Sequence, residues 1–326
     1  MGEGSLPAAE AEALIPQFVF ERLLNQDQAG RRISLLGSIA SKPALLVVER
    51  APFANDVAHV SSLAQSLSKI KNLGNNDIYF WFMASSSTSA TSTPVEDGAA
   101  TKQPPDLKVN LIYPCTPKHV KKYSQQLLRM VSETPEVYRK YVRPYMERQR
   151  SDGRLDWMYN ILEGRTEQDD VFFREPGPDG FLILPDLNWD RTTLLNLHVL
   201  ALVERRDIWS LRDLSHAHVP WLKDMSAKIL SATHKLYPDV ERDQLKLYVH
   251  YQPTYYHFHV HVVHVMFEAG ATQAVGKAFG LDNLIGQLEA MGEGKSMADV
   301  TLGYHLGEAS ELWTEVFGPL KEGKLP

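Results

Sequence analysis

Three histidines alternate with apolar residues in the sequence HFHVH at residues 257–261. Successive side chains of a β-strand point to opposite faces, so this spacing predicts that His257, His259 and His261 share one face. His264 has the other parity and is not expected to join them. Because a row of imidazoles is costly to bury in a dry core, we interpret this face as a site of chemistry.

Two chemistries fit imidazoles at this spacing, and a chance arrangement is a third interpretation. One imidazole can act as a nucleophile while its neighbours support it, and several imidazoles can bind zinc. Zinc sites usually add another ligand, often a carboxylate, and the nearest acid, Glu268, lies beyond the expected end of the strand. The nucleophile is therefore favoured, while the spacing alone leaves the other two interpretations open.

The elements that position these histidines are predicted to form a C-terminal catalytic domain, residues 150–326. Meandering strands combined with one long helix are typical of an antiparallel α+β domain. Ser215 is the expected N-cap of that helix, which spans residues 215–236. A buried helix is the alternative for residues 193–203. The predicted strands are residues 155–162, 170–173, 181–184, 193–203, 245–250 and 255–263.

The N-terminal part is predicted to be a second α+β domain, residues 16–116, after a disordered tail at residues 1–15. Residues 85–105 are rich in Ser, Thr, Ala and Pro, and are expected to form a mobile loop. A turn is expected at Lys42-Pro43. The predicted helices are residues 18–24 and 57–70, and the predicted strands are residues 33–39, 44–50, 76–82 and 107–113.

Two helix starts follow each other at Thr116-Pro117 and Thr134-Pro135, each with Thr as N-cap and Pro at the first helical position. An apolar stripe carries the first helix to Val131, and the second runs to residue 149 with a kink at Pro144. We interpret residues 117–149 as hinge helices. Residues 118–150 hold nine Lys/Arg against three Asp/Glu, which fits either an anion-attracting surface or an ordinary solvated helix face.

The composition is that of a soluble globular protein: 326 residues, 44% hydrophobic, 23% charged and a net charge of −6. This charge argues against a general nucleic-acid coat protein. The single cysteine, Cys115, cannot form an internal disulfide, and we expect a reducing compartment, the cytoplasm, with the nucleus as a further location. No run of 18 apolar residues is present, so we expect no membrane span.

The sequence HFHVHVV at residues 257–263 matches the His-x-His-x-His-x-x signature of the histidine-triad superfamily, in which x is apolar. The flanking residues 157–162, 184–189 and 248–256 resemble the scavenger mRNA-decapping enzymes of that superfamily. Further matches at residues 76–79 and 113–119 extend the resemblance to nearly the whole chain outside the tail and the Ser/Thr-rich loop.

The resemblance implies a pyrophosphatase that acts on the 7-methylguanosine cap of short RNA fragments left by 3′-to-5′ mRNA decay. His259 would attack the phosphate next to the methylguanosine and form a covalent phosphoramidate. Water would then release 7-methylguanosine monophosphate, leaving RNA with a 5′-diphosphate. His257 and His261 would support the nucleophile, with His250 as a further phosphate donor. No metal or other cofactor is expected.

Cap recognition would combine an indole and a carboxylate. A cationic methylated base is attracted to an indole face, and its Watson–Crick edge offers donors to a carboxylate. By the family's pattern these residues are Trp157 and Glu167, with Leu187 on the other face of the base and Glu163 as the alternative carboxylate. The other substrate-binding residues that the resemblance implies are Pro185, Asp186, Asn188, Thr254, Tyr255, Lys122, Tyr123, Asn76, Tyr79 and Lys277.

The chain departs from the family's pattern at three of these positions. Asn188 stands where Lys is usual, which removes a positive charge from the ligand loop. Thr254 stands where Ser is common and keeps the hydroxyl. Lys277 takes the place of a phosphate-side Arg after a shift of one residue.

The resemblance also implies a homodimer with exchanged N-terminal segments, in which the N-terminal domain closes over the active site as a lid. Three rival hypotheses make different predictions. Another histidine-triad nucleotidyl hydrolase, acting on dinucleoside polyphosphates or adenylyl amides, would ignore the methyl group. A non-enzymatic cap-binding protein would be unaffected by His259→Asn, and a zinc hydrolase would lose activity with a chelator.

Overall fold

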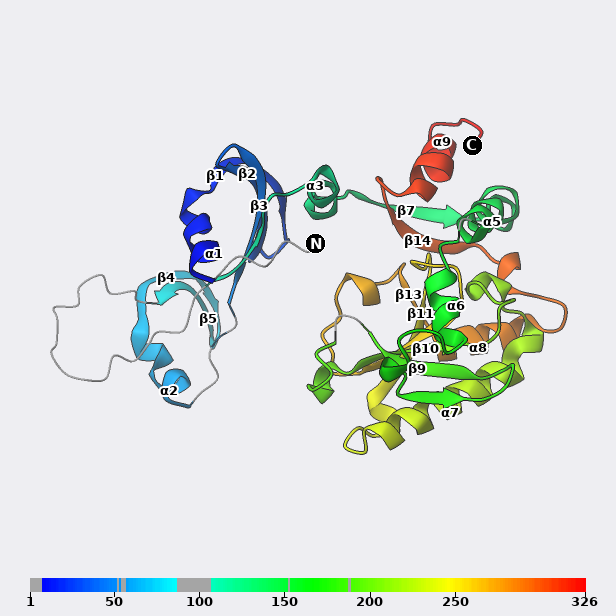
Figure 1. The fold of residues 1–326 in the computed structure, drawn as a ribbon. Coiled ribbons are helices and arrows are strands. Elements are labelled where there is room, and N and C mark those ends of the chain that lie inside the picture. Colours follow the sequence, from blue (N-terminus) through cyan, green and yellow to red (C-terminus); the bar gives the residue numbers. More distant parts are fainter. Residues whose placement is uncertain (1–7, 52, 54–56, 87–106, 152, 187–188) are drawn as a thin grey trace. The chain divides into compact units, whose positions relative to one another are not determined.

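The computed structural model describes residues 8–51, 53, 57–86, 107–151, 153–186 and 189–326 (Figure 1). It confirms a mixed α+β protein with antiparallel sheets. The chain divides into two compact units, residues 1–125 and 126–326, so the division falls within the stretch predicted to be hinge helices. The first seven residues of the predicted tail, nearly all of the predicted Ser/Thr-rich loop, and Leu187 and Asn188 lie outside the described residues.

The first unit contains a four-stranded antiparallel sheet and a separate hairpin. Both central residues of the β2–β3 turn, Ala40 and Ser41, have positive φ angles of 46° and 64°, as the tightest hairpin turns require. Buried side chains of the sheet pack together with Cys115. The sheet order is β1 (Val19–Gln26), β2 (Arg32–Ile39), β3 (Lys42–Arg50) and β6 (Leu107–Ile112); the other elements are α1 (Ala8–Leu14), the 3-10 turn Ile15–Gln17, α2 (Val57–Ser66), the β4–β5 hairpin (Leu67–Asn76, Tyr79–Ser86) and α3 (Pro117–Tyr123).

Several predictions for the first unit are wrong. Residues 18–24 are not a helix, because β1 pairs with β2 along this stretch, and this non-local pairing outweighs local helix propensity. Residues 8–14 form a helix, although a disordered tail was expected there. Lys42 and Pro43 are already paired within β3, so the turn lies two residues earlier. The predicted helix 57–70 gives way to β4 at Leu67.

The second unit is built on a six-stranded antiparallel sheet. The long helix α7 and the helix α8 share a hydrophobic core with Val260 and Val262 of the histidine strand. The opposite face carries Leu182 and Leu202, which pack with the helix α6. The sheet order is β13 (Ala278–Gly280), β11 (Leu245–His250), β12 (His259–His264), β10 (His198–Val203), β9 (Phe181–Pro185) and β8 (Phe173–Glu175), and the helices are α6 (Asp156–Leu162), α7 (Val219–Leu236) and α8 (Leu281–Met291).

A second, two-stranded sheet joins β7 (Leu128–Glu133) to β14 (Leu302–Gly307). After β7 the chain forms α4 (Pro135–Val137), a π-helical turn (Tyr138–Val142) and α5 (Arg143–Ser151). Thr134 is the N-cap of α4, and its hydroxyl accepts a hydrogen bond from the Val137 amide. The remaining short elements are Gln168–Asp170, Leu194–Asn196, Leu211–Asp213, His216–His218, Arg242–Gln244, Ala271–Gln273, Met297–Asp299, Trp313–Phe317 and α9 (Gly318–Lys321).

Five predicted elements from residue 117 onward need correction. The helix that begins at Pro117 ends at Tyr123, because residues 128–133 pair with β14. Residues 155–162 are a helix, not a strand, since their apolar side chains pack onto the sheet face. Residues 170–173 contain the end of a 3-10 turn, with β8 beginning at Phe173, and residues 194–196 form a turn before β10. The histidine strand begins at His259, later than expected.

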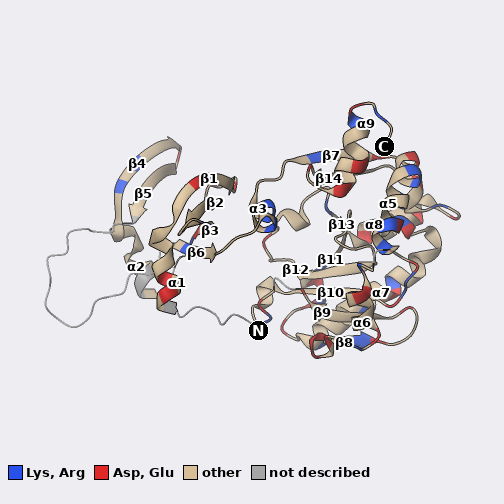
Figure 2. Ribbon diagram, turned by 45° about the horizontal axis from the view of Figure 1, so that its top comes forward, with Lys and Arg blue, Asp and Glu red and all other residues tan. Residues whose placement is uncertain are grey.

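The basic stretch at residues 118–150 consists of two different parts. Figure 2 shows basic residues on α3 and on α5; they are lysines in α3 and arginines in α5. The lysines of α3 are exposed. The arginines that follow pair with acids from distant parts of the second unit: Arg139 with Asp299, Arg143 with Asp213 and Arg148 with Glu315. The positive charge of these three arginines is therefore balanced locally, as expected for an ordinary solvated face.

Among the residues that the structure describes, none of the helices combines the length and the apolar character needed to cross a membrane.

Candidate active site

Two of the three alternating histidines lie side by side on the sheet. His259 and His261 belong to β12 and pair in register with Leu202 and Leu200 of β10. Their rings point to the face opposite the α7–α8 core, which is what the alternation in sequence predicts. His257 precedes the strand, in a loop, and its ring and that of Tyr159 form a T-shaped pair with centroids 6.1 Å apart. All three imidazoles are nearly inaccessible, at 0%, 6% and 6% exposure.

The hydrogen bond of His259 leaves one ring nitrogen available for chemistry. Its Nδ1 lies 2.8 Å from the carbonyl oxygen of His257. A carbonyl only accepts, so Nδ1 carries the proton and Nε2 keeps its lone pair. Burial lowers the pKa of His259 to about 4, and the ring is therefore neutral near pH 7. A neutral imidazole with a fixed tautomer is a competent nucleophile.

His257 and His250 are held by backbone carbonyls in the same manner, but through their other nitrogen. Nε2 of His257 donates to the carbonyl of Val203 at 2.7 Å, and Nε2 of His250 donates to that of Thr272 at 2.8 Å. Burial lowers the pKa of both to about 4. The single proton of each neutral ring is thus directed at the protein, and neither Nδ1 can donate to a ligand in this form.

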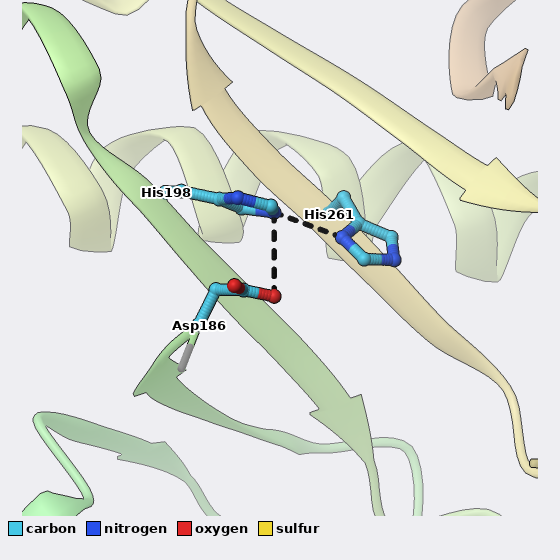
Figure 3. Close-up of side chains that lie close together, drawn as sticks. All are labelled: Asp186, His198 and His261. Atoms are coloured by element: carbon cyan, nitrogen blue, oxygen red, sulfur yellow. Dashed lines mark hydrogen bonds and ion pairs between the residues drawn. The ribbon is translucent and has the colours of Figure 1, made fainter. Parts of the chain in front are cut away.

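Another buried histidine, which the sequence pattern did not indicate, contacts His261. His198, at the start of β10, places its Nε2 3.0 Å from Nδ1 of His261 and 3.7 Å from a carboxylate oxygen of Asp186 (Figure 3). The carboxylate follows β9, so three strands supply this trio. Because the contact depends on the register of β10 against β12, local spacing gave no signal for it.

Within the described part of the chain, the trio is the one group of His, Cys, Asp or Glu whose three potential ligand atoms lie within 4.8 Å of one another. Two imidazoles and a carboxylate form a donor set that suits zinc. The two rings are, however, hydrogen-bonded to each other, so a metal would have to replace that bond. The absence of a metal therefore stays a prediction, which a chelator can test.

Aromatic contacts connect His259 to Trp157, the residues predicted to be the nucleophile and the cap-stacking indole. The ring of Tyr255 stacks on His259 with centroids 4.4 Å apart and planes 19° apart. Trp157 lies in the first turn of α6, and its indole meets the Tyr255 ring edge-on at 5.2 Å. Trp157 is 45% exposed, which leaves indole surface open to a ligand. Thr254, next to Tyr255, is exposed.

The two candidate carboxylates differ in what they already bind. Glu163 pairs with Arg206 at 2.6 Å and also with Arg165, and the Arg206 hydrogen bond lowers the pKa of its carboxyl. Glu167 is exposed at the start of a 3-10 turn, with a left-handed φ of 54°. This arrangement favours Glu167 over Glu163 for a ligand.

Lys277 supplies a positive charge near the histidines. Its amine donates to the carbonyl of Gln252 at 2.5 Å, and burial lowers the pKa of this amine. The same charge contributes to the lowered pKa of His250 and His259. Pro185 ends β9 and is buried directly before Asp186, whereas Leu187 and Asn188 lie outside the described residues.

The predicted N-terminal contacts all belong to the first unit. Asn76 ends β4, and Tyr79 opens β5 with 64% of its surface exposed. Lys122 and Tyr123 close α3, with the amine 5.5 Å from the centre of the neighbouring ring. The histidine site itself is built wholly from the second unit.

A buried ionic network supports the loop before the histidines. Glu133 and Arg212 have fully buried side chains 2.6 Å apart. Glu133 also accepts from the hydroxyls of Tyr251 at 2.6 Å and Tyr304 at 2.5 Å, and from the amide of Gln252 at 3.3 Å. This network fixes residues 251–252, including the carbonyl that receives the Lys277 amine. Sequence gave no sign of it, because its members come from distant segments.

Comparison with known proteins gives consistent results for both units. The family model described as Scavenger mRNA decapping enzyme (DcpS) N-terminal matches residues 13–126, and that described as Scavenger mRNA decapping enzyme C-term binding matches residues 156–276. An m7GpppX diphosphatase from Schizosaccharomyces pombe is 37% identical over 90% of this chain and 92% of its own length. Proteins of the same name from Ascaris suum and Homo sapiens are 37% and 32% identical, over 83% and 88% of this chain and 85% and 82% of their own.

Proposed function

The chain belongs to the scavenger mRNA-decapping enzyme family, and on that premise we propose that it is an m7GpppX diphosphatase. Its substrates are short capped RNA fragments left by 3′-to-5′ mRNA decay, or the cap dinucleotide itself. The products are 7-methylguanosine monophosphate and an RNA with a 5′-diphosphate. We place this reaction in the cytoplasm, with the nucleus as a further location.

The observation that carries the proposed mechanism is the bare Nε2 of His259, since Nδ1 donates to the His257 carbonyl. This nitrogen attacks the phosphorus attached to methylguanosine, and the bond from that phosphorus to the bridging oxygen of the second phosphate breaks. The electron pair leaves on the diphosphate of the RNA. Water then attacks the same phosphorus, and the phosphorus–nitrogen bond breaks with its electron pair returning to Nε2. One proton of the water is released to solvent, so the products are the monophosphate and the neutral imidazole.

The neighbouring groups divide the remaining work. Lys277 offers a buried positive charge to the phosphates, an electrostatic contribution that is strengthened where water is excluded. His257 orients His259 through its carbonyl oxygen and is itself held by Val203. His250 holds residue 272 through a carbonyl, so we assign it a positioning role while it is neutral.

We propose that the cap is recognised by Trp157 and Glu167. The open indole surface of Trp157 stacks on the cationic base, and the exposed carboxylate of Glu167 accepts from its Watson–Crick edge. Tyr255 bridges Trp157 and His259, and can therefore relate the position of the base to that of the nucleophile. Asp186, next to the ligand loop, faces the nucleoside.

We also propose a homodimer with exchanged N-terminal segments. Support comes from the β4–β5 hairpin, which is two-stranded and carries many exposed apolar side chains. An isolated two-stranded hairpin is marginal in water, so a second copy of the chain would stabilise it by covering these residues. The exposed residues, at 51–64% exposure, are Ile70, Leu73, Tyr79, Phe80, Trp81, Phe82 and Met83.

In the deciding experiment the protein hydrolyses m7GpppG in water labelled with oxygen-18. Attack at the methylguanosine phosphate places the label in 7-methylguanosine monophosphate and leaves the guanosine diphosphate unlabelled. Label in the diphosphate would contradict the assigned phosphorus, and no turnover would favour a protein that only binds caps. Equal rates with GpppG would favour another nucleotidyl hydrolase, and loss of activity in EDTA would favour a zinc enzyme.

A variant pair tests the nucleophile. His259→Asn is expected to abolish hydrolysis while the protein still binds the cap dinucleotide. The matched control is His234→Asn, since the ring of His234 is likewise bonded to a carbonyl, that of Val240. His234 is partly buried and lies outside the site. This control should retain turnover, and residual hydrolysis by His259→Asn at the wild-type rate would exclude the mechanism.

A further inference from the structure

His261 differs from the other imidazoles of the site in what orients it. His250, His257 and His259 each direct their proton to a backbone carbonyl, which fixes the tautomer unambiguously. His261 instead faces the side chain of His198, and either ring could donate in that contact. A second group must therefore decide where the single proton of neutral His261 resides.

Asp186 lies where its charge can determine which ring nitrogen carries that proton. Its carboxylate oxygen lies 3.7 Å from the same Nε2 of His198 that contacts His261 at 3.0 Å. A bare lone pair on this Nε2 would face the negative carboxylate, whereas a proton there is attracted by it and can still be donated to His261. The proton of this contact therefore belongs to His198.

We propose that His198, held in its Nε2-protonated form by Asp186, is a positioning residue that keeps the proton of His261 on Nε2. Because His198 donates to Nδ1 of His261, that nitrogen must be bare, and the only proton of the neutral ring remains on the other side. This inference deepens the proposed function, on which its kinetic part rests.

The far side of the His261 ring is consistent with a donor reserved for substrate. Its Nε2 is buried and has no hydrogen-bond partner within the described residues. Leaving a buried donor unpaired costs about 1–3 kcal/mol, a cost that a bound phosphate oxygen can remove. The ring centre lies 5.3 Å from that of the nucleophile His259 and 4.1 Å from that of His250.

Packing keeps the ring in this orientation. Tyr248 stacks on His261 with planes 2° apart and centroids 4.9 Å apart. Burial in the first place, and the imidazoles of His259, His250 and His198 in addition, lower the pKa of His261 well below its usual value. The ring therefore offers one proton, and its location decides whether His261 can donate to the substrate or only accept.

The first experiment reads the tautomer directly in the wild-type protein without substrate. Nitrogen NMR of protein labelled in its histidine rings distinguishes protonated from bare ring nitrogens. We expect His261 and His198 to carry their protons on Nε2, and His259 on Nδ1. A proton on Nδ1 of His261 would overturn the proposal, whether or not the protein hydrolyses caps.

The second experiment separates positioning from structural support by exchanging His198. His198→Phe keeps a ring but removes the donor, so kcat for m7GpppG should fall about 100-fold with KM little changed, and the His261 tautomer should shift. His198→Gln keeps an N–H donor near the position of Nε2 and should recover kcat to within about 10-fold of wild type. His234→Phe is the control for losing a partly buried histidine and should leave kcat unchanged.

Equal losses of kcat in His198→Phe and His198→Gln would overturn the positioning role, as would an unchanged kcat in His198→Phe. Should the Phe variant fail to fold, the wild-type NMR spectrum and the Gln variant still decide. If the wild-type protein does not hydrolyse caps, the proposed function fails, while the tautomer measurement stands on its own.

Discussion

Replacing Trp157 by Leu tests the origin of methyl discrimination. The indole is 45% exposed and would stack on the methylated base, where a cation–π attraction contributes about 0.5–2 kcal/mol beyond ordinary stacking. The same indole meets Tyr255 edge-on, and such an aromatic pair contributes about 0.5–1.5 kcal/mol. Only the first contribution depends on the methyl group, because the second supports the ring that stacks on His259 for any substrate.

The two contributions separate when m7GpppG and GpppG compete in one reaction. Trp157→Leu should lower kcat/KM for both substrates, through lost stacking and a less supported Tyr255. The ratio of the two kcat/KM values should fall by a further factor of about 2 to 30, the equivalent of 0.5–2 kcal/mol. Trp313→Leu, at a partly buried indole outside the site, is the matched control and should leave the ratio unchanged.

An equal fall for the methylated and the unmethylated substrate would refute the reasoning, because it would make Trp157 a stacking or structural residue without a role in sensing charge. Unchanged kcat/KM for both would show that the exposed indole does not contact the cap.

Three other changes follow from the same structure. Glu167→Gln should lower kcat/KM for m7GpppG about 10-fold or more, since charged hydrogen bonds contribute about 1.5–3 kcal/mol. Glu163→Gln should lower it less than about 3-fold, because two arginines already bind that carboxylate. A larger loss in Glu163→Gln than in Glu167→Gln would identify Glu163 as the residue that binds the base. Because burial lowers the pKa of His259 to about 4, the imidazole should stay neutral down to pH 5, and kcat/KM should fall only below that pH. A fall of kcat/KM near the ordinary histidine pKa of about 6.5 would contradict this. Glu133→Ala leaves Arg212 buried without its counter-charge and should reduce the free energy of unfolding, measured in denaturant, by about 3–5 kcal/mol. A reduction no larger than that caused by removing an acid from an exposed ion pair would contradict the assigned network.

The parts of the fold that sequence predicted are those whose signal is local. Strands at residues 33–39 and 245–250, and the helix after Ser215, have clear apolar periodicity next to turn or capping residues. The failures at residues 18–24 and 155–162 share one cause. A short apolar stretch fits a helix or a strand, and only a distant partner decides between them.

The candidate site divides along the same line. Alternation places His259 and His261 on one face without any knowledge of the other strands. His198 could not be found this way, because its contact depends on how β10 is aligned with β12. Glu133 likewise meets Tyr251 across more than a hundred residues of chain. Long-range register, not residue type, is what the sequence leaves undetermined.

The burial of the imidazoles explains why their partners matter so much. A charged imidazole needs no orientation to donate, because both nitrogens carry protons. Burial instead lowers the pKa of His257 and His259 to about 4, and the pKa of His261 further, so each ring has one proton near neutral pH. The site then works only if each proton is on the correct nitrogen. A backbone carbonyl fixes the proton of His259 on Nδ1, whereas the position of the proton on His261 depends on His198. A substitution at His198 should therefore change kcat more than KM.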